Sequence, residues 1–465
     1  MAVLSSEAVE FEMTLPLVII GAGACGLTAA LAAYDEGIEA LVIERDSVPQ
    51  GSTALSSGMI PACGTAQQKA LGVEDSVALM SQDILSKCHG ETDHAMVKNL
   101  CAQSGATIDW LCEKHNIGLT LVEGFLYPNH SQLRMHAPKS RQGTDLVGSL
   151  RQAVEAVGVD IFIDAVVTDL FADDNNRVHG LSLTRPDGST SKLGCQTLIL
   201  ACNGFGGNQQ MMQRFIPQMA GGNYFGHMGN QGDAILWGEA LGAQMADLGA
   251  FQGHGSVAHP HGILISWALM MEGGIQVNVD AQRFSNEHQG YSEQGRRVLR
   301  QPEATVWCIY DTRLHQLGGD FEDYRLAEKG GAVRTAASIE ALAELCDLNS
   351  ANLAKTLAAT QTFAAGASAD PFGRDFTTKP ALVAPYFAVK VTGSLFHTQG
   401  GLVVDDKARV MSQKGKALAN LYAGGGAARG LSGPSDWGYL SGNGLLTAVV
   451  LGRIAGRSAA NQIKC

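Results

Sequence analysis

Near its start, the chain has two short apolar runs separated by a glycine turn and an alanine-rich stretch. The apolar run LPLVII at 15–20 is followed by the glycine turn GAGACG and an alanine-rich stretch. A second apolar run, ALVI, ends at the acidic residue Glu44. Short apolar runs bounded by turns are typical of buried parallel strands, so this segment predicts a strand–helix–strand unit.

Hydrophobic spacing predicts the elements that follow. Residues 66–118 have apolar positions three and four apart and predict helices, whereas 158–204 predict strands separated by turns. A helix that begins with an acid is expected at 232–243. Helices are also expected over roughly 333–366, with Ser350 as an N-cap.

The sequence pattern changes twice along the chain, which suggests that one domain is split by an inserted one. Histidines and short strands begin near 250, and glycine-rich turns return near 390. We expect an α/β fold with a Rossmann-like dinucleotide-binding domain built from 14–250 and 390–465. An α+β capping domain is inserted at 251–389.

Composition narrows the class of partner. Hydrophobic residues make up 45% of the chain, and the formal net charge is −12. No basic block occurs, which argues against nucleic acid or an anionic membrane as a partner. No leader pattern and no membrane-length apolar run is present, so a cytoplasmic protein without a membrane span is expected. The ten cysteines contain no CxxC pair and are expected to be reduced.

The first glycine turn has the G-x-G-x-x-G pattern of a dinucleotide site. Gly21 permits the tight turn, Gly23 lets a pyrophosphate approach the backbone, and Gly26 lets helix and strand pack closely. The helix that opens at Ala24 offers free N–H groups to an anion. Glu44 lies 18 residues after Gly26, at the place of an acid that accepts from a ribose hydroxyl.

The segment after Glu44 favours FAD over NAD. Residues 45–59, RDSVPQGSTALSSGM, form a hydroxyl-rich loop that suits a pyrophosphate and a flavin edge. An NAD domain normally continues into another strand–helix unit. The last helix, after Gly444, would direct its N-terminus at the pyrimidine side of the flavin.

Several segments together resemble one family. GAGACG with Glu44, GSTALSSG, ACNGFGGN, RFSNE, HTQGGLVVD, LYAGGG and SGNGLLTAVVLGRIAGRSAA resemble the fumarate reductase–ketosteroid dehydrogenase flavoproteins, in matching order over nearly the whole chain. The resemblance implies bound FAD and a capping domain. It also implies reduction or desaturation of a carbon–carbon bond beside an activating group. Some members attach the flavin through a histidine in the loop after the acid strand; residues 45–59 contain none, so FAD is expected to be non-covalent.

The glycine turns and the resemblance together assign the following cofactor-binding residues: Gly21, Gly23, Ala24, Gly26, Glu44, Arg45, Ser52, Thr53, Ser57, Gly58, Met59, Val166, Ala201, Asn203, Gly204, Asp233, His397, Gly425, Gly426, Asn443, Leu445 and Leu446.

The resemblance also separates the branches of the family. The fumarate branch has an arginine four residues after the Glu of RFxNE, where this chain has Tyr291. A second arginine lies on the C-terminal glycine turn, where this chain has Tyr439. The site therefore lacks the two arginines that would bind the carboxylates of a dicarboxylate substrate, whereas two phenols suit a neutral carbonyl. The ketosteroid dehydrogenases have tyrosines at both positions.

Other substrate-site positions follow the same comparison. Ser266 and Trp267 replace a Thr-Glu pair of the fumarate branch, while His254 and His397 remain where that branch has histidines. We assign His254, Ser266 and Trp267 to the substrate site. His254 is alternatively a satisfied capping-domain histidine, and His397 serves either cofactor or substrate. Arg141 is a candidate for a substrate carboxylate, although the cluster Arg134, Lys139 and Arg141 is most simply a solvated loop. His259 and His261 lack a third ligand, so no metal is expected.

These residues suggest a mechanism. The Tyr439 hydroxyl and the Asn443 backbone N–H polarise a ketone oxygen, as in an oxyanion site. Tyr291 accepts the α-proton as general base, with Tyr127 as its candidate partner, and Ser441 relays a proton to or from Tyr439. The β-hydrogen leaves as hydride to flavin N5. Arg283, Asn286 and Glu287 are expected to be structural, with an ion pair that ties the capping domain to the flavin domain.

Three functions remain open from the sequence. The first is an FAD-dependent desaturase of a cyclic ketone, either a 3-ketosteroid or a smaller cyclohexanone-like ring that can carry a carboxyl group. Its electrons pass to an external acceptor: a quinone, an electron-transfer protein or O₂. The second is a fumarate-type ene-reductase acting on an unsaturated acid or enone. The third is a flavin-binding protein without catalysis, which the polar groups at the flavin argue against.

Overall fold

The computed structural model describes residues 1–465 and divides the chain into two units. Unit 1 consists of Met1–Ile216, Gly226–Phe251 and His397–Cys465, and unit 2 of Pro217–Phe225 and Gln252–Phe396. The chain passes between the units four times as a result. Each unit has its own sheet and its own core.

The central sheet of unit 1 is built from the apolar runs seen in the sequence. β10 (Thr190–Leu200) pairs in parallel with β2 (Met13–Ile20) and with β21 (Ala417–Ala423). β2 pairs in parallel with β3 (Ala40–Ile43), and β3 with β7 (Asp160–Phe162). Strands of parallel sheets are buried on both faces, which explains why these runs are continuously apolar. The predicted Rossmann-like α/β fold is confirmed by this sheet.

The other strands of unit 1 extend this sheet or form small sheets. The nine-stranded sheet also contains β1 (Ala2–Ser5), β8 (Val166–Ala172), β9 (Val178–Thr184) and β20 (Arg409–Met411). The small sheets contain β4 (Ile60–Pro61), β5 (Thr120–Leu121) and β6 (Met135–Ala137), and β12 (Met245–Ala246) with β19 (Gly401–Leu402).

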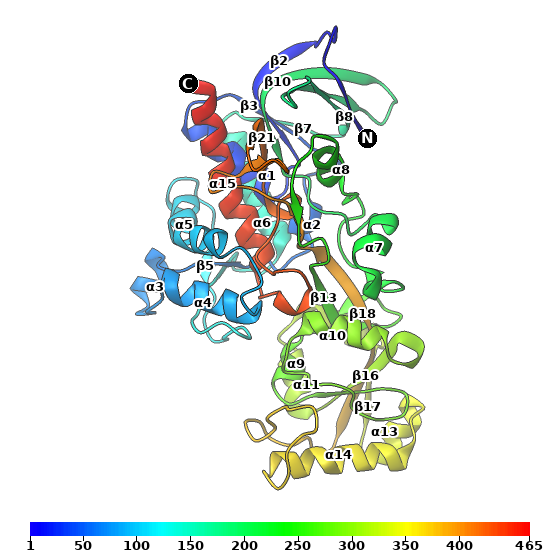
Figure 1. The fold of residues 1–465 in the computed structure, drawn as a ribbon. Helices are drawn as coiled ribbons and strands as arrows, with labels where there is room; N and C mark the ends of the chain where they lie inside the picture. The colour runs from blue at the N-terminus through cyan, green and yellow to red at the C-terminus, as the bar shows by residue number, and fades with distance from the viewer. The chain divides into compact units, whose positions relative to one another are not determined.

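The helices of unit 1 lie against and around the sheet (Figure 1). They are α1 (Ala24–Asp35), α2 (Gly51–Ala54), α3 (Ala66–Ala70), α4 (Val77–Lys87), α5 (His94–Glu113), α6 (Gly143–Ala156), α7 (Gln209–Phe215), α8 (Asp233–Ala240) and α15 (Asn443–Lys464).

The two helices that carry glycine turns at their N-termini, α1 and α15, pack side by side (Figure 1). Gly452 and Gly456 of α15 face the backbone of α1 so closely that a Cβ atom would overlap the carbonyl oxygens of Cys25 and Ala29. Only glycine permits this approach of two backbones. The contact fixes α15 against the helix that follows the first glycine turn.

Unit 2 is a seven-stranded sheet covered by helices. Its central strand, β18 (Tyr386–Thr398), pairs antiparallel with β16 (Thr305–Asp311) and β17 (Val333–Ala336). The other strands are β11 (Asn223–Tyr224), β13 (Phe251–Ala258), β14 (Ile263–Leu264) and β15 (Ile275–Val277). The helices are α9 (Ala268–Met271), α10 (Tyr291–Leu299), α11 (Thr312–Gly318), α12 (Glu322–Lys329), α13 (Ile339–Cys346) and α14 (Ser350–Ala364). The mixture of strands and helices is the expected α+β class.

Some local predictions differ from the structure. Residues 333–336 form β17 and not a helix, because they pair with β18. The N-cap of α14 is Asn349, whose side chain accepts from the N–H of Asn352 at 3.0 Å, and Ser350 is the first helical residue. Pro217–Phe225 belongs to unit 2, because β11 pairs with β18.

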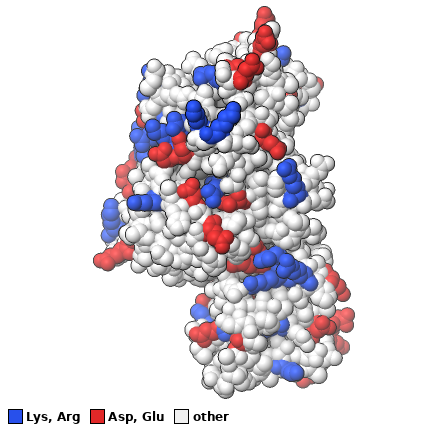
Figure 2. Space-filling model, in the orientation of Figure 1, with Lys and Arg blue, Asp and Glu red and all other residues white.

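The surface carries charged side chains of both signs, and the cysteines form no disulfide bond. Acidic and basic side chains are interspersed over the face drawn in Figure 2. All ten cysteines are free thiols, and most are buried. No helix has both the length and the apolar character that crossing a bilayer requires.

The α1–α15 contact gives a stability prediction. Gly456→Ala places a methyl group against the Ala29 carbonyl, and overpacking of this kind costs about 1–3 kcal/mol. The midpoint of thermal unfolding should fall by several degrees. Gly148→Ala is the matched control, because Gly148 lies in α6 with open space around it. That change should leave the midpoint unchanged or raise it, since alanine favours a helix by about 0.5–1 kcal/mol over glycine.

Candidate active site

The first glycine turn has the close packing that its pattern predicted. Gly21 has φ +106°, and a Cβ atom there would lie 2.5 Å from the Ala201 carbonyl oxygen. A Cβ atom on Gly26 would overlap the Gly21 carbonyl oxygen. Gly26 therefore permits the close packing of helix and strand.

The turn leaves backbone donors available at the N-terminus of α1. Glu44 Oε2 accepts from the Ala22 N–H at 2.8 Å, and Thr53 Oγ1 accepts from the Ala24 N–H at 3.0 Å. The N–H groups of Gly23, Cys25 and Gly26 have no acceptor within the chain. Free N–H groups at a helix N-terminus suit an anion such as a pyrophosphate.

The turn borders a half-open cleft within unit 1. Clefts with a few convergent polar groups are common small-molecule or cofactor sites. More than half of the predicted cofactor-binding residues line it: Gly21, Gly23, Ala24, Glu44, Arg45, Ser52, Thr53, Ala201, Asn203, Asp233, Gly425 and Gly426.

Other predicted cofactor residues lie outside this cleft. Val166 does not line it, whereas its neighbours Ala165 and Val167 do. The segment Ser57, Gly58 and Met59 does not line it either; a Cβ atom on Gly58 would lie 3.1 Å from the Gln142 carbonyl oxygen. Gly204 is required for packing, because a Cβ atom there would overlap Thr398 Oγ1.

Sequence reasoning missed the loop 226–231, part of which lines the cleft, because it has no hydrophobic pattern. His227 Nε2 lies 2.8 Å from Asp46 Oδ2, and Asn230 donates to Ser52 Oγ at 2.9 Å. Asp233, at the start of α8, pairs with Arg45 at 2.7 Å. Three side-chain contacts thus join this loop and Asp233 to the segment after Glu44, and all six partners line the cleft.

A second group of predicted residues gathers at the N-terminus of α15. The Tyr439 ring is buried and lies edge-on to the His397 ring at 5.6 Å. His397 accepts at Nδ1 from the Gln399 side-chain amide at 2.8 Å, or donates to it if the amide is reversed. A Cβ atom on Gly444 would lie 2.8 Å from His397 Cε1. Tyr439, His397 and the start of α15 therefore form one site, as expected from the sequence.

The Asn443 N–H is not the free donor that the sequence suggested. It donates to the Leu440 carbonyl at 3.1 Å, which closes the turn before the helix. The N–H groups of Gly444 and Leu445 have no acceptor within the chain, and Leu446 donates to Gly442. The Asn443 side chain is fully buried, and neither of its amide atoms has a partner.

Tyr127 lies at the start of a loop that ends near Arg134. The Tyr127 hydroxyl donates to Met59 Sδ at 2.8 Å, and burial raises the pKa of this phenol to about 12. Its role as a partner of Tyr291 stays a prediction. Arg141 and Lys139 are exposed. Arg134 is not part of a solvated loop, because its side chain is fully buried between Asp75 and Asp83.

In unit 2, Tyr291 lies in an aromatic group. It is the first residue of α10, and its ring stacks on the His254 ring at 4.9 Å. The Trp267 ring meets His254 edge-on at 5.8 Å.

The neighbouring residues of unit 2 have structural contacts. The Ser266 hydroxyl accepts from the Ala268 N–H at 3.3 Å, and the Trp267 indole N–H donates to the Glu287 carbonyl at 3.1 Å. Arg283 pairs with Glu287 at 2.7 Å, which confirms the expected ion pair. Its further partner, Asp370, also belongs to unit 2, so this network is internal to the unit and does not tie it to unit 1.

The histidines of both groups are uncharged at neutral pH. Burial lowers the pKa of His254 to about 3 and that of His397 to about 4. Neither imidazole supplies a cation for a substrate carboxylate. No group of three His, Cys, Asp or Glu side chains in the chain is arranged to hold a metal ion.

Comparison with known proteins identifies the family. Residues 17–445 match the model of the family described as FAD binding domain. The chain belongs to this family. It is a flavoprotein with FAD as its cofactor, and the predicted FAD-dependent oxidoreductase class is confirmed.

Individual relatives agree with the predicted resemblance. The chain is 29% identical over 454 residues to the probable fumarate reductase Ifc3 of Shewanella frigidimarina (strain NCIMB 400), covering 97% of this chain and 75% of the relative. An open flavocytochrome c3 fumarate reductase structure aligns with a TM-score of 0.83 at 28% identity, over 97% of this chain and 79% of that one. The 3-ketosteroid-Δ4-(5α)-dehydrogenase of Rhodococcus jostii RHA1 aligns with a TM-score of 0.79 at 23% identity, over 98% and 99%.

The residues present fit FAD. The free N–H groups of the first glycine turn suit the pyrophosphate, and Glu44 lines the same cleft, where it can accept from a ribose hydroxyl. The free N–H groups of Gly444 and Leu445 suit the acceptor atoms of the flavin pyrimidine ring. The buried, unpartnered amide of Asn443 lies at the same helix end. Buried polar atoms are almost always hydrogen-bonded, so this amide indicates a ligand nearby.

The loop 226–231 gives a prediction about cofactor retention. His227→Ala removes one of the three contacts to the segment after Glu44, and a hydrogen bond to a charged group is worth about 1.5–3 kcal/mol when buried and less when partly exposed. We expect FAD to dissociate about three to ten times faster, measured by recovery of flavin fluorescence on dilution. His179→Ala is the matched control: it removes a His–Asp contact of 3.0 Å in unit 1 outside the cleft. Equal dissociation rates in the two variants would contradict this role for the loop.

The neutral buried histidines predict a pH dependence of stability. An unfolded histidine has a pKa of about 6.5, whereas the pKa of His254 in the folded protein is about 3. Between these values the unfolded state binds more protons, so stability is complete above pH 6.5 and falls as the pH decreases. Each such histidine costs about 2 kcal/mol at pH 5. Thermal unfolding of His254→Phe should therefore depend less on pH between 7.5 and 5.0 than that of the wild type or of His94→Phe, an exposed control.

Proposed function

We propose that the protein is an FAD-dependent dehydrogenase acting on CH–CH groups, which introduces a C=C bond α,β to the carbonyl of a cyclic ketone. The substrate class is a 3-ketosteroid or a smaller cyclohexanone-like ring. The observation that carries the proposal is the pair of phenols, Tyr291 and Tyr439. They stand where the fumarate branch has arginines, and both have a neutral imidazole as neighbour.

The uncharged histidines beside the two phenols argue for a neutral substrate. A dicarboxylate needs guanidinium groups that bind both of its oxygens. Here Tyr439 packs on His397 and Tyr291 on His254, and burial keeps both histidines uncharged. Arg141, exposed on its loop, remains the cation proposed for a carboxyl group on the ring.

The proposed chemistry assigns one task to each phenol. The Tyr439 hydroxyl donates a hydrogen bond to the ketone oxygen and so acidifies the α-carbon; an oxyanion donor of this kind contributes about 100-fold or more. Tyr291, as phenolate at the start of α10, takes the α-proton. Ser441, two residues after Tyr439, is the residue proposed to exchange a proton with it. FAD, when bound, accepts the β-hydrogen and its two electrons, and the external acceptor then reoxidises it.

A second candidate is an ene-reductase of an unsaturated acid or enone. The 29% identity to a probable fumarate reductase favours it, since that relative is named for reduction. Because hydride transfer is reversible, the same site chemistry could serve either candidate. The two candidates differ in their substrate and in the direction of the reaction.

Anaerobic reduction of the bound flavin separates the two candidates. A saturated 3-ketosteroid, cyclohexanone, 4-oxocyclohexanecarboxylate and succinate are added to separate samples, and loss of flavin absorbance is followed. Bleaching by a ketone supports the dehydrogenase, and the fastest ring identifies the substrate class. Bleaching by no ketone, together with reoxidation of the reduced protein by fumarate or an enone, would establish the reductase.

The two phenols give a mutational prediction. Tyr291→Phe removes the base and Tyr439→Phe the carbonyl donor, so each should lower the rate of flavin reduction by about 100-fold or more. FAD content should stay at the wild-type level, because neither phenol lines the cleft. Tyr34→Phe, an exposed tyrosine on α1, is the control and should have wild-type activity. Wild-type rates in both site variants would remove the basis of the proposal.

A further inference from the structure

His130 is a buried residue that the proposed chemistry does not use. It is 6% exposed and lies on the loop between Tyr127 and Arg134. Its Nε2 atom lies 3.0 Å from the Ser441 carbonyl oxygen. A carbonyl only accepts, so Nε2 carries the hydrogen and donates it. His130 is thus bonded to the turn that carries Tyr439.

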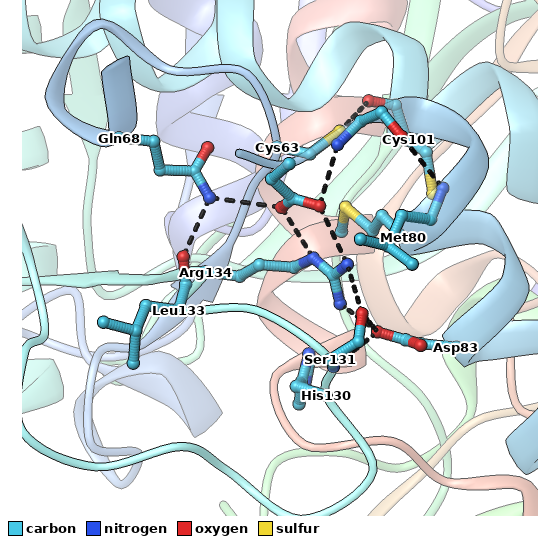
Figure 3. A network of polar contacts seen from close by, with 12 residues as sticks. Cys63, Gln68, Met80, Asp83, Cys101, His130, Ser131, Leu133 and Arg134 are labelled. Atoms are coloured by element: carbon cyan, nitrogen blue, oxygen red, sulfur yellow. Dashed lines mark hydrogen bonds and ion pairs between the residues drawn. The ribbon is translucent and has the colours of Figure 1, made fainter. Parts of the chain in front are cut away.

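The loop that presents His130 is fixed by a buried charge network (Figure 3). The Arg134 guanidinium donates to both oxygens of Asp75, at 2.7 and 2.9 Å, and to Asp83. Asp83 also accepts from the backbone N–H and the hydroxyl of Ser131, each at 2.8 Å. Ser131 is the neighbour of His130, so these contacts hold the part of the loop that directly follows the imidazole.

The bond to Ser441 fixes the orientation of one peptide group. The peptide between Ser441 and Gly442 is trans, so its C=O and its N–H point in opposite directions. With the carbonyl held by His130, the Gly442 N–H points away from His130. This N–H has no acceptor within the chain. It is a free backbone donor three residues after Tyr439.

Gly442 cannot be replaced by another residue without moving the turn. Its φ is +85°, and a Cβ atom would lie 2.6 Å from Pro61 Cδ. The positive φ is a conformation that L-residues avoid, and the contact with Pro61 leaves no room for a side chain. The Asn443 N–H, one position later, is already bonded to Leu440. Of these two amides, only that of Gly442 is available to a ligand.

We propose that His130 is a positioning residue, which holds the Ser441–Gly442 peptide so that the Gly442 N–H serves with the Tyr439 hydroxyl as the second donor to the ketone oxygen. This inference rests on the proposed function. It replaces the Asn443 amide by the Gly442 amide and assigns a purpose to the Arg134 network. Without the imidazole, the peptide can rotate and the second donor is lost from its place.

The test uses the FAD-loaded protein and three changes of His130. His130→Leu and His130→Asn remove the bond to Ser441, since leucine has no donor and asparagine is too short. His130→Gln keeps an N–H near the position of Nε2. His115→Leu is the matched control, because His115 is a buried histidine of unit 1 whose ring bonds to Asp35 and not to this turn. Two readouts are measured: hydrogen–deuterium exchange of the peptide covering 439–446, and the rate of flavin reduction by the ketone over a range of concentrations.

We expect exchange in 439–446 to be about tenfold faster in His130→Leu and His130→Asn, since a hydrogen bond is worth roughly 1 kcal/mol or more. The limiting rate of flavin reduction should fall about 10- to 100-fold, with a smaller change in the ketone concentration at half-maximal rate. His130→Gln should restore both readouts to within about threefold. His115→Leu should change neither.

Each contrary result decides one part of the proposal. Unchanged exchange in His130→Leu and His130→Asn would show that His130 does not hold the turn and would overturn the inference. Faster exchange with an unchanged reduction rate would overturn the role of the Gly442 amide. If no ketone bleaches the wild-type flavin, the proposed function fails and the catalytic half of this inference fails with it. The exchange data then decide the positioning half alone.

Discussion

The backbone contact between α1 and α15 is the constraint on which unit 1 depends. Gly452 and Gly456 let the last helix lie directly on the carbonyls of Cys25 and Ala29. One end of α1 is the first glycine turn, and one end of α15 is the turn with Tyr439. The two helix N-termini, which offer free N–H groups, therefore belong to one rigid pair. FAD has a pyrophosphate in its middle and an electron-poor ring at one end, and the two helix N-termini suit these two groups.

A second constraint is the packing of the two phenols against uncharged rings. Tyr291 and Tyr439 each pack against a histidine that burial keeps uncharged. The buried ion pairs of Arg134 and of Arg283 hold backbone segments in position. The histidine beside each phenol therefore offers a substrate no full charge.

The sequence predicted those features that depend on local pattern. The strand–turn–helix with Gly21 and Gly26 could be found because its spacing reflects close packing of adjacent elements. The loop with His227 and Asn230 could not be found, because its contacts to Asp46 and Ser52 join residues more than 170 positions apart. The Asn443 amide was assigned wrongly, since its bond to Leu440 depends on how the turn closes and not on residue type. Arg134 was placed in a solvated loop because Asp75 and Asp83 lie far from it in sequence. The roles of Tyr291 and Tyr439 remain predictions.

The path of the chain between the units has a consequence for how the protein can be divided. The chain crosses at four places, after Ile216, Phe225, Phe251 and Phe396. A tandem pair of domains separates when a protease cuts one linker. Here a single cut at any crossing leaves the units joined by three covalent connections. Neither unit corresponds to one continuous stretch of sequence, so no simple truncation yields it. Separate expression of unit 2 would require its two segments to be joined by a new linker in place of residues 226–251.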